Sequence, residues 1–420
     1  MNLHKRLICA LNGLVCTALL ASCTPNGNDT HPVTITDSGN ASDLFGPPVQ
    51  TDTGWEASRP VGMMPARDHC TGKHVIATYF RTYSSESAST PSATPNSATT
   101  LVSLNLQDGS VRWARKITPA MHAIQGYDKS ETPQGSLLKI QGCASTALIS
   151  NERYLAFHLH PWMTPEGSSS IGDQRMNIVV LDTETGNEVR TVEVSGLVLG
   201  QAIVNDSLVV ETAQNYYPGG TGVLNVFSLT DPDAEPVTTR TDNWLVGSTK
   251  DSLLMSPQSS MTKKAEWRRE EFHRISTIVR TNTSGETLKT ITGVTAIHPN
   301  GWIERAKNPQ KAAEAAASPD KTPLAALPRD LINIDSGASV DVTGQYVTSV
   351  NLPTGPGLLL RTVTTTGEGE EKKTTYINHS WLPATSDSTE PRTDDMQQID
   401  LDNKANKVFS KPIRMGEEEK

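Results

Sequence analysis

A hairpin pattern recurs along this 420-residue chain, and it limits the fold to one built from many short antiparallel strands. In the clearest copy, apolar residues alternate from Val102 to Leu106, Asp108-Gly109 follows, and Val111 opens the return strand. Alternation with a period of two is typical of strands with one buried face, and Asp-Gly favours a tight hairpin turn. Further copies lie at 178–189, 226–233, 278–285, 331–337 and 399–408.

A second kind of strand pair separates these hairpins, at 147–157, 200–210, 244–255 and 294–303. One pair of each kind makes a four-stranded sheet, and the spacing of about 45 to 65 residues between turns is the range of propeller repeats with insertions. Since one four-stranded sheet cannot bury both of its faces, such sheets must stack in a ring. We therefore predict an all-β fold over 55–413, a β-propeller of about six to eight four-stranded blades, rather than a β-sandwich with a second β domain.

The hairpin motifs resemble those of a known family. The segment from Leu104 to Trp113 follows the pattern Leu-x-x-x-Asp-Gly-x-x-x-Trp, and Leu181–Gly186 carries a related Leu-Asp-x-x-Thr-Gly pattern. Both are similar to the blade motif of the quinoprotein-like (PQQ-like) β-propellers, in which the tryptophan docks each blade onto the next. The resemblance implies this role for Trp113. In the next unit Arg190 holds the tryptophan position, and later units match the pattern less well.

The resemblance also raises the question of an enzyme. A quinoprotein dehydrogenase would be expected to carry adjacent cysteines against its quinone and a carboxylate set for Ca²⁺, but no adjacent cysteines occur. His158 and His160 share one face of a predicted strand, yet the spacing indicates no third ligand for a metal. We therefore assign no catalytic residue, no metal ligand and no cofactor. The alternative is a glycan hydrolase or lyase that uses the propeller channel, for which Asp68 and His69 are the only obvious pair.

The N-terminus predicts where the protein resides. Lys5 and Arg6 precede an apolar run that ends at Leu20, too short to span a bilayer comfortably, and small residues then precede Cys23. This pattern resembles the lipobox of bacterial lipoproteins, in which a diacylglyceryl group is joined to the cysteine sulfur and the preceding peptide is removed. The resemblance implies a signal peptide at 1–22, lipidation at Cys23 and a place on the extracytoplasmic side of the cell membrane. An ordinary secretory signal or an uncleaved anchor is the alternative.

Composition defines the segments that flank the propeller. Residues 23–54 are rich in Thr, Asn, Asp, Ser, Gly and Pro, and they predict a lipidated, disordered tether because they bury too little to offset the entropy of ordering. Residues 414–420 predict a frayed tail. Cys70 and Cys143 remain in a compartment where disulfides persist, so a disulfide between them and two separate thiols are both open.

Charge excludes one class of partner. The chain has 37 Lys+Arg against 46 Asp+Glu, a net charge of −9, whereas nucleic-acid binding needs a dense basic face. We expect no nucleic-acid partner, and we expect contact with the membrane through the lipid anchor alone.

Long segments predict a binding face. They lie at 84–100, 161–176, 215–222, 256–272 and 307–329, each between the second and third strands of a predicted blade, and such segments share one face of a propeller. Within one of them, Trp267, Arg268 and Arg269 form a candidate partner-contact strip, with a solvated charged loop as the alternative. We predict a non-enzymatic binding or scaffolding module of the cell envelope, whose partner is an unknown envelope protein or glycan.

Overall fold

The computed structural model shows a chain made almost entirely of antiparallel strands. It describes residues 33–38, 47–51, 54–56, 63–65, 69–71, 74–81, 99–105, 108–118, 148–151, 153–159, 175–213, 222–257, 277–317, 327–352, 355–366, 373–384 and 388–393. The chain divides into two compact units, Met1–Val33 and Thr34–Lys420, and the second contains every described strand. The last predicted hairpin, at 399–408, lies outside the described residues.

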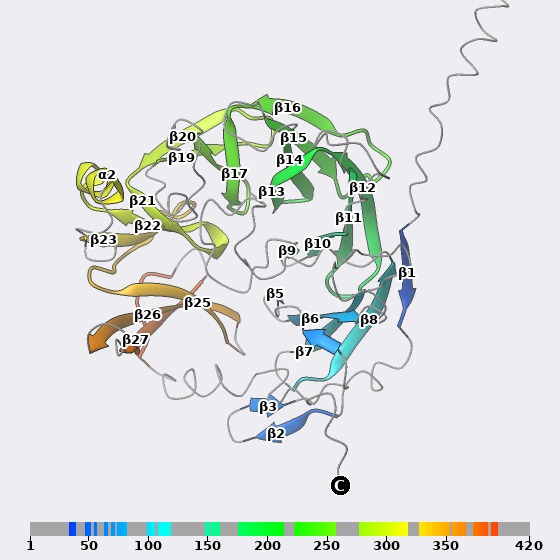
Figure 1. Cartoon of the computed structure of the whole chain (residues 1–420), viewed down its shortest axis with the longest axis horizontal. Helices are drawn as coiled ribbons and strands as arrows, with labels where there is room; N and C mark the ends of the chain where they lie inside the picture. The colour runs from blue at the N-terminus through cyan, green and yellow to red at the C-terminus, as the bar shows by residue number, and fades with distance from the viewer. Residues whose placement is uncertain are drawn as a thin grey trace, which may run out of the picture. The chain divides into compact units, whose positions relative to one another are not determined.

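Within the second unit, six sheets follow one another in chain order around a ring, which confirms the predicted β-propeller (Figure 1). The first blade contains β4 (Met63–Pro65), β5 (His69–Thr71), β6 (His74–Arg81), β7 (Thr99–Asn105) and β8 (Val111–Thr118), and β1 (Thr34–Asp37) extends it beyond β8. The second blade contains β9 (Leu148–Ser150), β10 (Tyr154–His158), β11 (Arg175–Asp182) and β12 (Glu188–Ser195). The third contains β13 (Leu197–Val204), β14 (Ser207–Ala213), β15 (Gly222–Ser228) and β16 (Val237–Thr241).

The last three blades continue the same order. The fourth contains β17 (Asn243–Ser248), β18 (Leu253–Pro257), β19 (Thr277–Thr281) and β20 (Thr287–Thr292). The fifth contains β21 (Val294–Ile297), β22 (Trp302–Ala306), β23 (Arg329–Asn333) and β24 (Ser339–Asp341), with the 3₁₀ turn η5 (Pro299–Gly301) and the helix α2 (Pro309–Ala317) between strands. The sixth contains β25 (Tyr346–Leu352), β26 (Gly355–Thr366) and β27 (Lys373–Pro383), and a backbone bridge between Trp381 and Arg392 begins a fourth position. β26 lies against β5 of the first blade, so the last blade meets the first.

Two described strands lie inside the range 23–54, which composition predicted to be a disordered tether. β1 pairs with the outer strand β8, and β2 (Val49–Thr51) forms a hairpin with β3 (Gly54–Glu56). An outer strand offers a row of unpaired backbone groups, so a polar segment with little to bury can still be ordered by main-chain hydrogen bonds. The ordered part of the chain therefore begins before Trp55.

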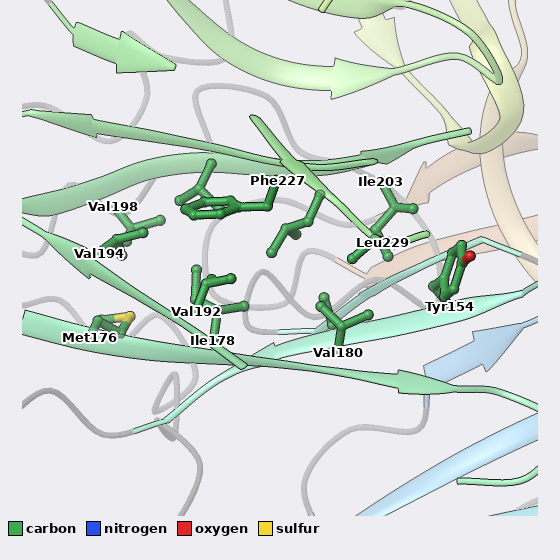
Figure 2. Packing of buried hydrophobic residues seen from close by; sticks show 13 residues of the cluster. Tyr154, Met176, Ile178, Val180, Val192, Val194, Val198, Ile203, Phe227 and Leu229 are labelled. Carbon is green, nitrogen blue, oxygen red and sulfur yellow. The ribbon is translucent and has the colours of Figure 1, made fainter. Parts of the chain in front are cut away.

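The hydrophobic core lies between the blades. The largest cluster among the described residues joins the second and third blades, with Tyr154, Ile178 and Val192 on one side and Ile203 and Phe227 on the other (Figure 2). Equivalent clusters lie between the third and fourth, fourth and fifth, and fifth and sixth blades. From the second blade to the sixth, neighbouring blades therefore bury their faces against one another, as the ring requires.

Trp113 docks the first blade onto the second, as the family resemblance implied. Its indole N–H donates to the carbonyl of Thr183 at 2.9 Å, and its ring lies over Gly186, where an added Cβ would come within 2.5 Å of the ring. The turn that receives it is held by Asp182, whose carboxylate accepts the N–H groups of Glu184 and Thr185. Gly186 has a φ of 67°, which a residue without a side chain adopts at little cost.

The same docking position carries different residues in the second and third blades. Arg190, the third residue of β12, donates to the carbonyls of Ser228 at 2.8 Å and Ala234 at 2.7 Å, so it holds the second blade to the third. Thr239, the third residue of β16, lies against Gly285 of the fourth blade. The tryptophan role is therefore taken over first by an arginine and then by a small side chain.

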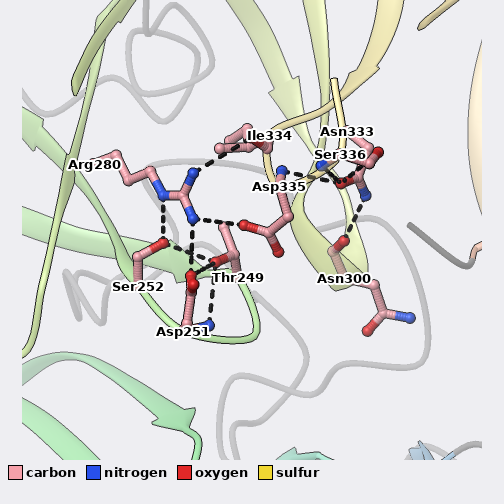
Figure 3. A network of polar contacts seen from close by, with 9 residues as sticks. All are labelled: Thr249, Asp251, Ser252, Arg280, Asn300, Asn333, Ile334, Asp335 and Ser336. Carbon is pink, nitrogen blue, oxygen red and sulfur yellow. Dashed lines mark hydrogen bonds and ion pairs between the residues drawn. The ribbon is translucent and has the colours of Figure 1, made fainter. Parts of the chain in front are cut away.

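Arg280 of β19 joins the fourth blade to the fifth (Figure 3). Its guanidinium donates to Ser252 at 2.6 Å and Asp251 at 2.8 Å on its own blade, and to Asp335 at 2.7 Å on the next. Lys289, at the third position of β20, is exposed, so the described contact from the fourth blade to the fifth is this charge-assisted bridge rather than a side chain at the docking position.

Replacing Gly186 by alanine should weaken the first blade boundary specifically. Gly186→Ala and Gly337→Ala place a Cβ at positive φ values of 67° and 77°, which costs about 1–2 kcal/mol each. Only Gly186→Ala also collides with the Trp113 ring, so we expect an additional loss of about 1–3 kcal/mol in the free energy of unfolding. Urea denaturation of the two variants measures the difference, and equal losses would contradict the docking role of Trp113.

Candidate functional site

The candidate functional site is one end of the propeller, which we call the insertion-bearing face. The strand order places every second-to-third-strand connection at this end, because successive strands of a blade alternate in direction. These connections are 82–98, 159–174, 214–221, 258–276, 307–328 and 367–372. The five long segments predicted to share one face therefore do lie between second and third strands, as the sequence indicated.

The opposite end, which we call the turn face, is closed by short turns that bond to one another. Asn151 donates to the carbonyl of Asn205 at 3.2 Å, and the N–H of Asn205 donates to the carbonyl of Lys250 at 3.1 Å. Asn300 donates to the carbonyl of Ala384 at 2.8 Å, which joins the fifth blade to the end of the sixth. Because these turn residues form contacts between blades, we expect the turn face to tolerate less change in sequence and length than the insertion-bearing face.

The start of α2 is the best-described part of the insertion-bearing face. Lys307 lies 2.6 Å from Asp341 and 3.3 Å from Asp330, and its ammonium group together with Thr343 lowers the pKa of Asp341 to about 2. Asn308 accepts the N–H of Lys311 at 3.1 Å and so caps the helix. Ion pairs of Lys307 therefore fix the start of this insertion to its own blade.

Glu211 is a buried acid near the same end of the third blade. It is 0% exposed, and its Oε2 accepts the N–H of Leu245 in the inner strand of the fourth blade at 2.6 Å. Its Oε1 has no hydrogen-bond partner among the described residues, and a Cβ at Gly222 would come within 2.4 Å of it. Burial raises the pKa of Glu211 to about 8, although the Leu245 hydrogen bond acts in the other direction. Glu211 is therefore protonated near neutral pH.

Glu304 holds the equivalent position in the fifth blade. In both blades the first strand contains a bulge, and the acid pairs with the residue that follows it. This residue is Gly200 for Glu211 and Ala296 for Glu304. In the fourth blade the residue at this register position is Leu254. Glu304 pairs with Arg329, and its Oε1 lies 3.0 Å from Nε2 of the buried His298.

These partners set the charge of Glu304. Burial alone would raise its pKa, but the His298 contact and the Arg329 charge outweigh burial and hold the pKa below its usual range. Arg329 also donates to the carbonyl of Gln345, just ahead of the sixth blade. Equivalent acids thus serve as a neutral hydrogen-bond acceptor in one interface and as part of an ion pair in another.

The described inner strands are free of carboxylates. The first strand of each blade lies innermost in the ring (Figure 1). None of the described inner strands β4, β5, β9, β13, β17, β21 and β25 contains Asp or Glu. Across the described ranges, no three His, Cys, Asp or Glu side chains gather as a metal site would require. In the same ranges, no helix has the length and hydropathy needed to cross a membrane.

Most of the predicted site residues lie outside the described part of the chain. These are Cys23, Cys143, Trp267, Arg268 and Arg269. Cys70 lies in β5, opposite Val75 of β6. The lipidation, the disulfide alternative and the partner-contact strip therefore stay predictions.

Sequence analysis missed the two buried glutamates. Each directly follows apolar residues on the second strand of a blade, in Leu208-Val209-Val210-Glu211 and in Trp302-Ile303-Glu304. An acid that directly follows a run of apolar residues within a strand is the signal that identifies such a residue, since Glu is rarely buried without a partner.

Comparison with known proteins returned structures but no sequence relative. No family model matches the chain, and no curated protein matches it. The β-propeller domain of the Trilobed protease from Pyrococcus furiosus matches with 11% identity and a TM-score of 0.37, over 76% of this chain and 84% of that one. BamB from Moraxella catarrhalis matches with 14% identity and a TM-score of 0.27, over 71% and 78%.

An acylaminoacyl peptidase from Pyrococcus horikoshii also matches, with 11% identity and a TM-score of 0.30, over 76% of this chain and 57% of the peptidase. The chain thus spans little more than half of that enzyme. The propeller assignment therefore depends on the sheets of this chain themselves.

Neutralising Glu211 should change how stability depends on pH. The folded protein keeps a proton up to a pKa of about 8, whereas the ordinary Glu pKa is 4.5, so the free energy of unfolding falls as pH rises from about 4.5 to about 8. Glu211→Gln removes this fall. Relative to wild type, we therefore expect the substitution to raise the free energy of unfolding by about 2–4 kcal/mol more at pH 8 than at pH 5. Glu314→Gln, at an exposed acid of α2, is the control. Parallel pH profiles of urea stability for wild type and Glu211→Gln would contradict the buried, protonated state.

Proposed function

We propose that this chain is a lipid-anchored, extracytoplasmic β-propeller that acts as a non-enzymatic binding or scaffolding module of the bacterial cell envelope. The observation that carries the proposal is the contrast between its two ends. One end has short turns tied together from blade to blade, and the other has every second-to-third-strand insertion. A rigid ring with variable segments on one face is the usual arrangement of a repeat protein that binds a partner.

The lipobox pattern at Cys23 supports the proposed location. A diacylglyceryl group on the cysteine together with an N-linked acyl chain supplies the multiple chains that stable membrane attachment needs. The alternative, a glycan-active enzyme that uses the channel, requires acids or histidines that converge on the inner strands. The described inner strands contain no Asp or Glu, and His69 of β5 is the one histidine among them, so the described residues do not supply the converging set that this alternative requires.

The insertion 258–276 tests the binding role. It connects the paired strands β18 and β19, which stay in register through Met255 and Val279, so a short Gly/Ser linker can replace it. We expect the melting temperature to change by only a few degrees, because long surface connections contribute little to stability. Crosslinking in intact cells, followed by capture of the protein, should lose an envelope partner that the wild type retains.

Two controls make this test specific. Replacement of 82–98 in the same way removes a Ser/Thr/Pro-rich insertion and should retain the partner. The triple variant Trp267→Ala, Arg268→Ala, Arg269→Ala tests the candidate strip within 258–276. Partner capture that survives the replacement of both insertions would refute the proposed binding face.

Cys23→Ala tests the anchor. The variant lacks the sulfur that takes the lipid, so it should leave the membrane fraction and enter the soluble extracytoplasmic fraction. Carbonate-washed membranes and the soluble fraction, compared by immunoblot, measure the change. Retention of Cys23→Ala on the washed membranes would show that another segment holds the protein there.

A further inference from the structure

Glu211 holds the third blade against one residue of the fourth, Leu245. Its Oε2 atom accepts the Leu245 N–H at 2.6 Å. Gly200, which pairs with Glu211, lies so close that an added Cβ would come within 2.3 Å of the Leu245 carbonyl oxygen. β17 is the inner edge of its sheet, and an edge strand offers backbone groups that its own sheet does not pair. The third blade therefore approaches both backbone groups of Leu245.

The strands packed around Glu211 contain no charge that balances its own. Its row crosses the third blade, and an apolar row of the fourth blade packs against it in one cluster. The first row is Gly200, Glu211, Leu224 and Thr239, and the second is Leu245, Met255, Val279 and Thr290. Apart from Glu211, the described strands β13, β14, β15, β17 and β18 contain no titratable residue.

The charged groups of the neighbouring segments lie away from this carboxyl. Arg240 of β16 follows Thr239 by one position, so it lies on the other face of the third blade. Arg280 and Lys289 are opposite one another on the face of the fourth blade toward the fifth, where Arg280 forms its ion pairs. Asp242, in the connection between β16 and β17, is exposed and carries the same sign of charge as an ionised Glu211.

A carboxylate in such a place is strongly disfavoured. Burial of an unpaired charge costs far more free energy than burial of a neutral carboxyl with one hydrogen bond. Burial accordingly raises the pKa of Glu211 to about 8. The ionised side chain needs water, and it reaches water where the two blades separate.

We propose that Glu211 is an alkaline-sensitive latch: when its carboxyl loses the proton, the boundary between the third and fourth blades opens locally while the other boundaries of the ring stay closed. The latch belongs to the ring itself, so it requires neither the lipid anchor nor a partner. Local opening of this kind is a normal property of folded proteins, and the least stable contact opens first.

Two features confine the opening to this boundary. Thr239 docks here with a short side chain against Gly285, whereas Arg190 and Arg280 form hydrogen bonds across the boundaries on either side. Glu304 holds the equivalent position between the fifth and sixth blades, but its pairing with Arg329 favours the ionised form. Rising pH therefore removes the contact of Glu211 and leaves that of Glu304 intact.

Hydrogen exchange measured by mass spectrometry tests the latch in the full chain. With a pKa of about 8 in the closed boundary and 4.5 in the open one, the open fraction rises on the order of 100-fold from pH 6 to pH 9. After correction for the intrinsic pH dependence of exchange, we expect the protection of 197–213 and 243–257 to fall by about this factor. Segments 294–306 and 346–352, at the Glu304 boundary, are the internal control and should keep their protection.

Three variants separate the proton from the shape of the side chain. Glu211→Gln keeps an oxygen for the Leu245 N–H but does not ionise, so protection of the boundary should not change between pH 6 and pH 9. Glu211→Leu installs the residue that the fourth blade has at this register position, Leu254, and should lower protection equally at both pH values. Gly222→Ala places a Cβ within 2.4 Å of the Glu211 Oε1 atom, so it should lower protection already at pH 6.

Three results would overturn the latch. Wild-type protection that is the same at pH 6 and pH 9 would show that the boundary does not respond to the proton of Glu211. A loss of protection that persists in Glu211→Gln would assign the response to another group. An equal loss at the Glu304 boundary would show that the whole ring opens instead of one boundary.

Discussion

The contact between neighbouring blades is the constraint on which this structure depends. A four-stranded antiparallel sheet has two faces to cover, and the described clusters show neighbouring blades covering one another from the second blade to the sixth. Apolar side chains such as Phe227 and Trp302 supply the area, but area alone does not fix how far one blade is rotated against another. Polar groups at fixed points do that, namely Trp113 on a backbone carbonyl, Arg190 on three, and Arg280 on an ion pair.

Blade packing also explains the division between the two ends of the ring. Short turns between adjacent strands lie next to the turns of the neighbouring blade, so Asn151 and Asn300 bond outside their own blades. Connections from second to third strand leave at the other end, where the paired strands are already in register. That end can accept insertions of different length without disturbing the core.

Much of the fold was predictable from the sequence because period-two alternation and turn residues are local signals. The hairpin from Val102 to Val111 and the docking role of Trp113 are both confirmed. The position of Arg190 was predicted, but its function as a docking residue was not, since a substitution in a motif does not show which carbonyls a new side chain will reach. β1 was missed because backbone pairing with a distant edge leaves no mark in the composition of a four-residue polar strand. Glu211 and Glu304 require the register of two blades at once, which no single segment encodes.

The changing docking residue has a consequence for the order of the repeats. Trp113 needs a glycine beneath its ring, Arg190 needs three carbonyls spaced to its guanidinium, and Thr239 needs a turn that comes close to a short side chain. A blade moved or duplicated within the ring would meet a turn that its own docking residue does not match. Each of the first three blades therefore carries a docking residue that matches the turn of its own successor.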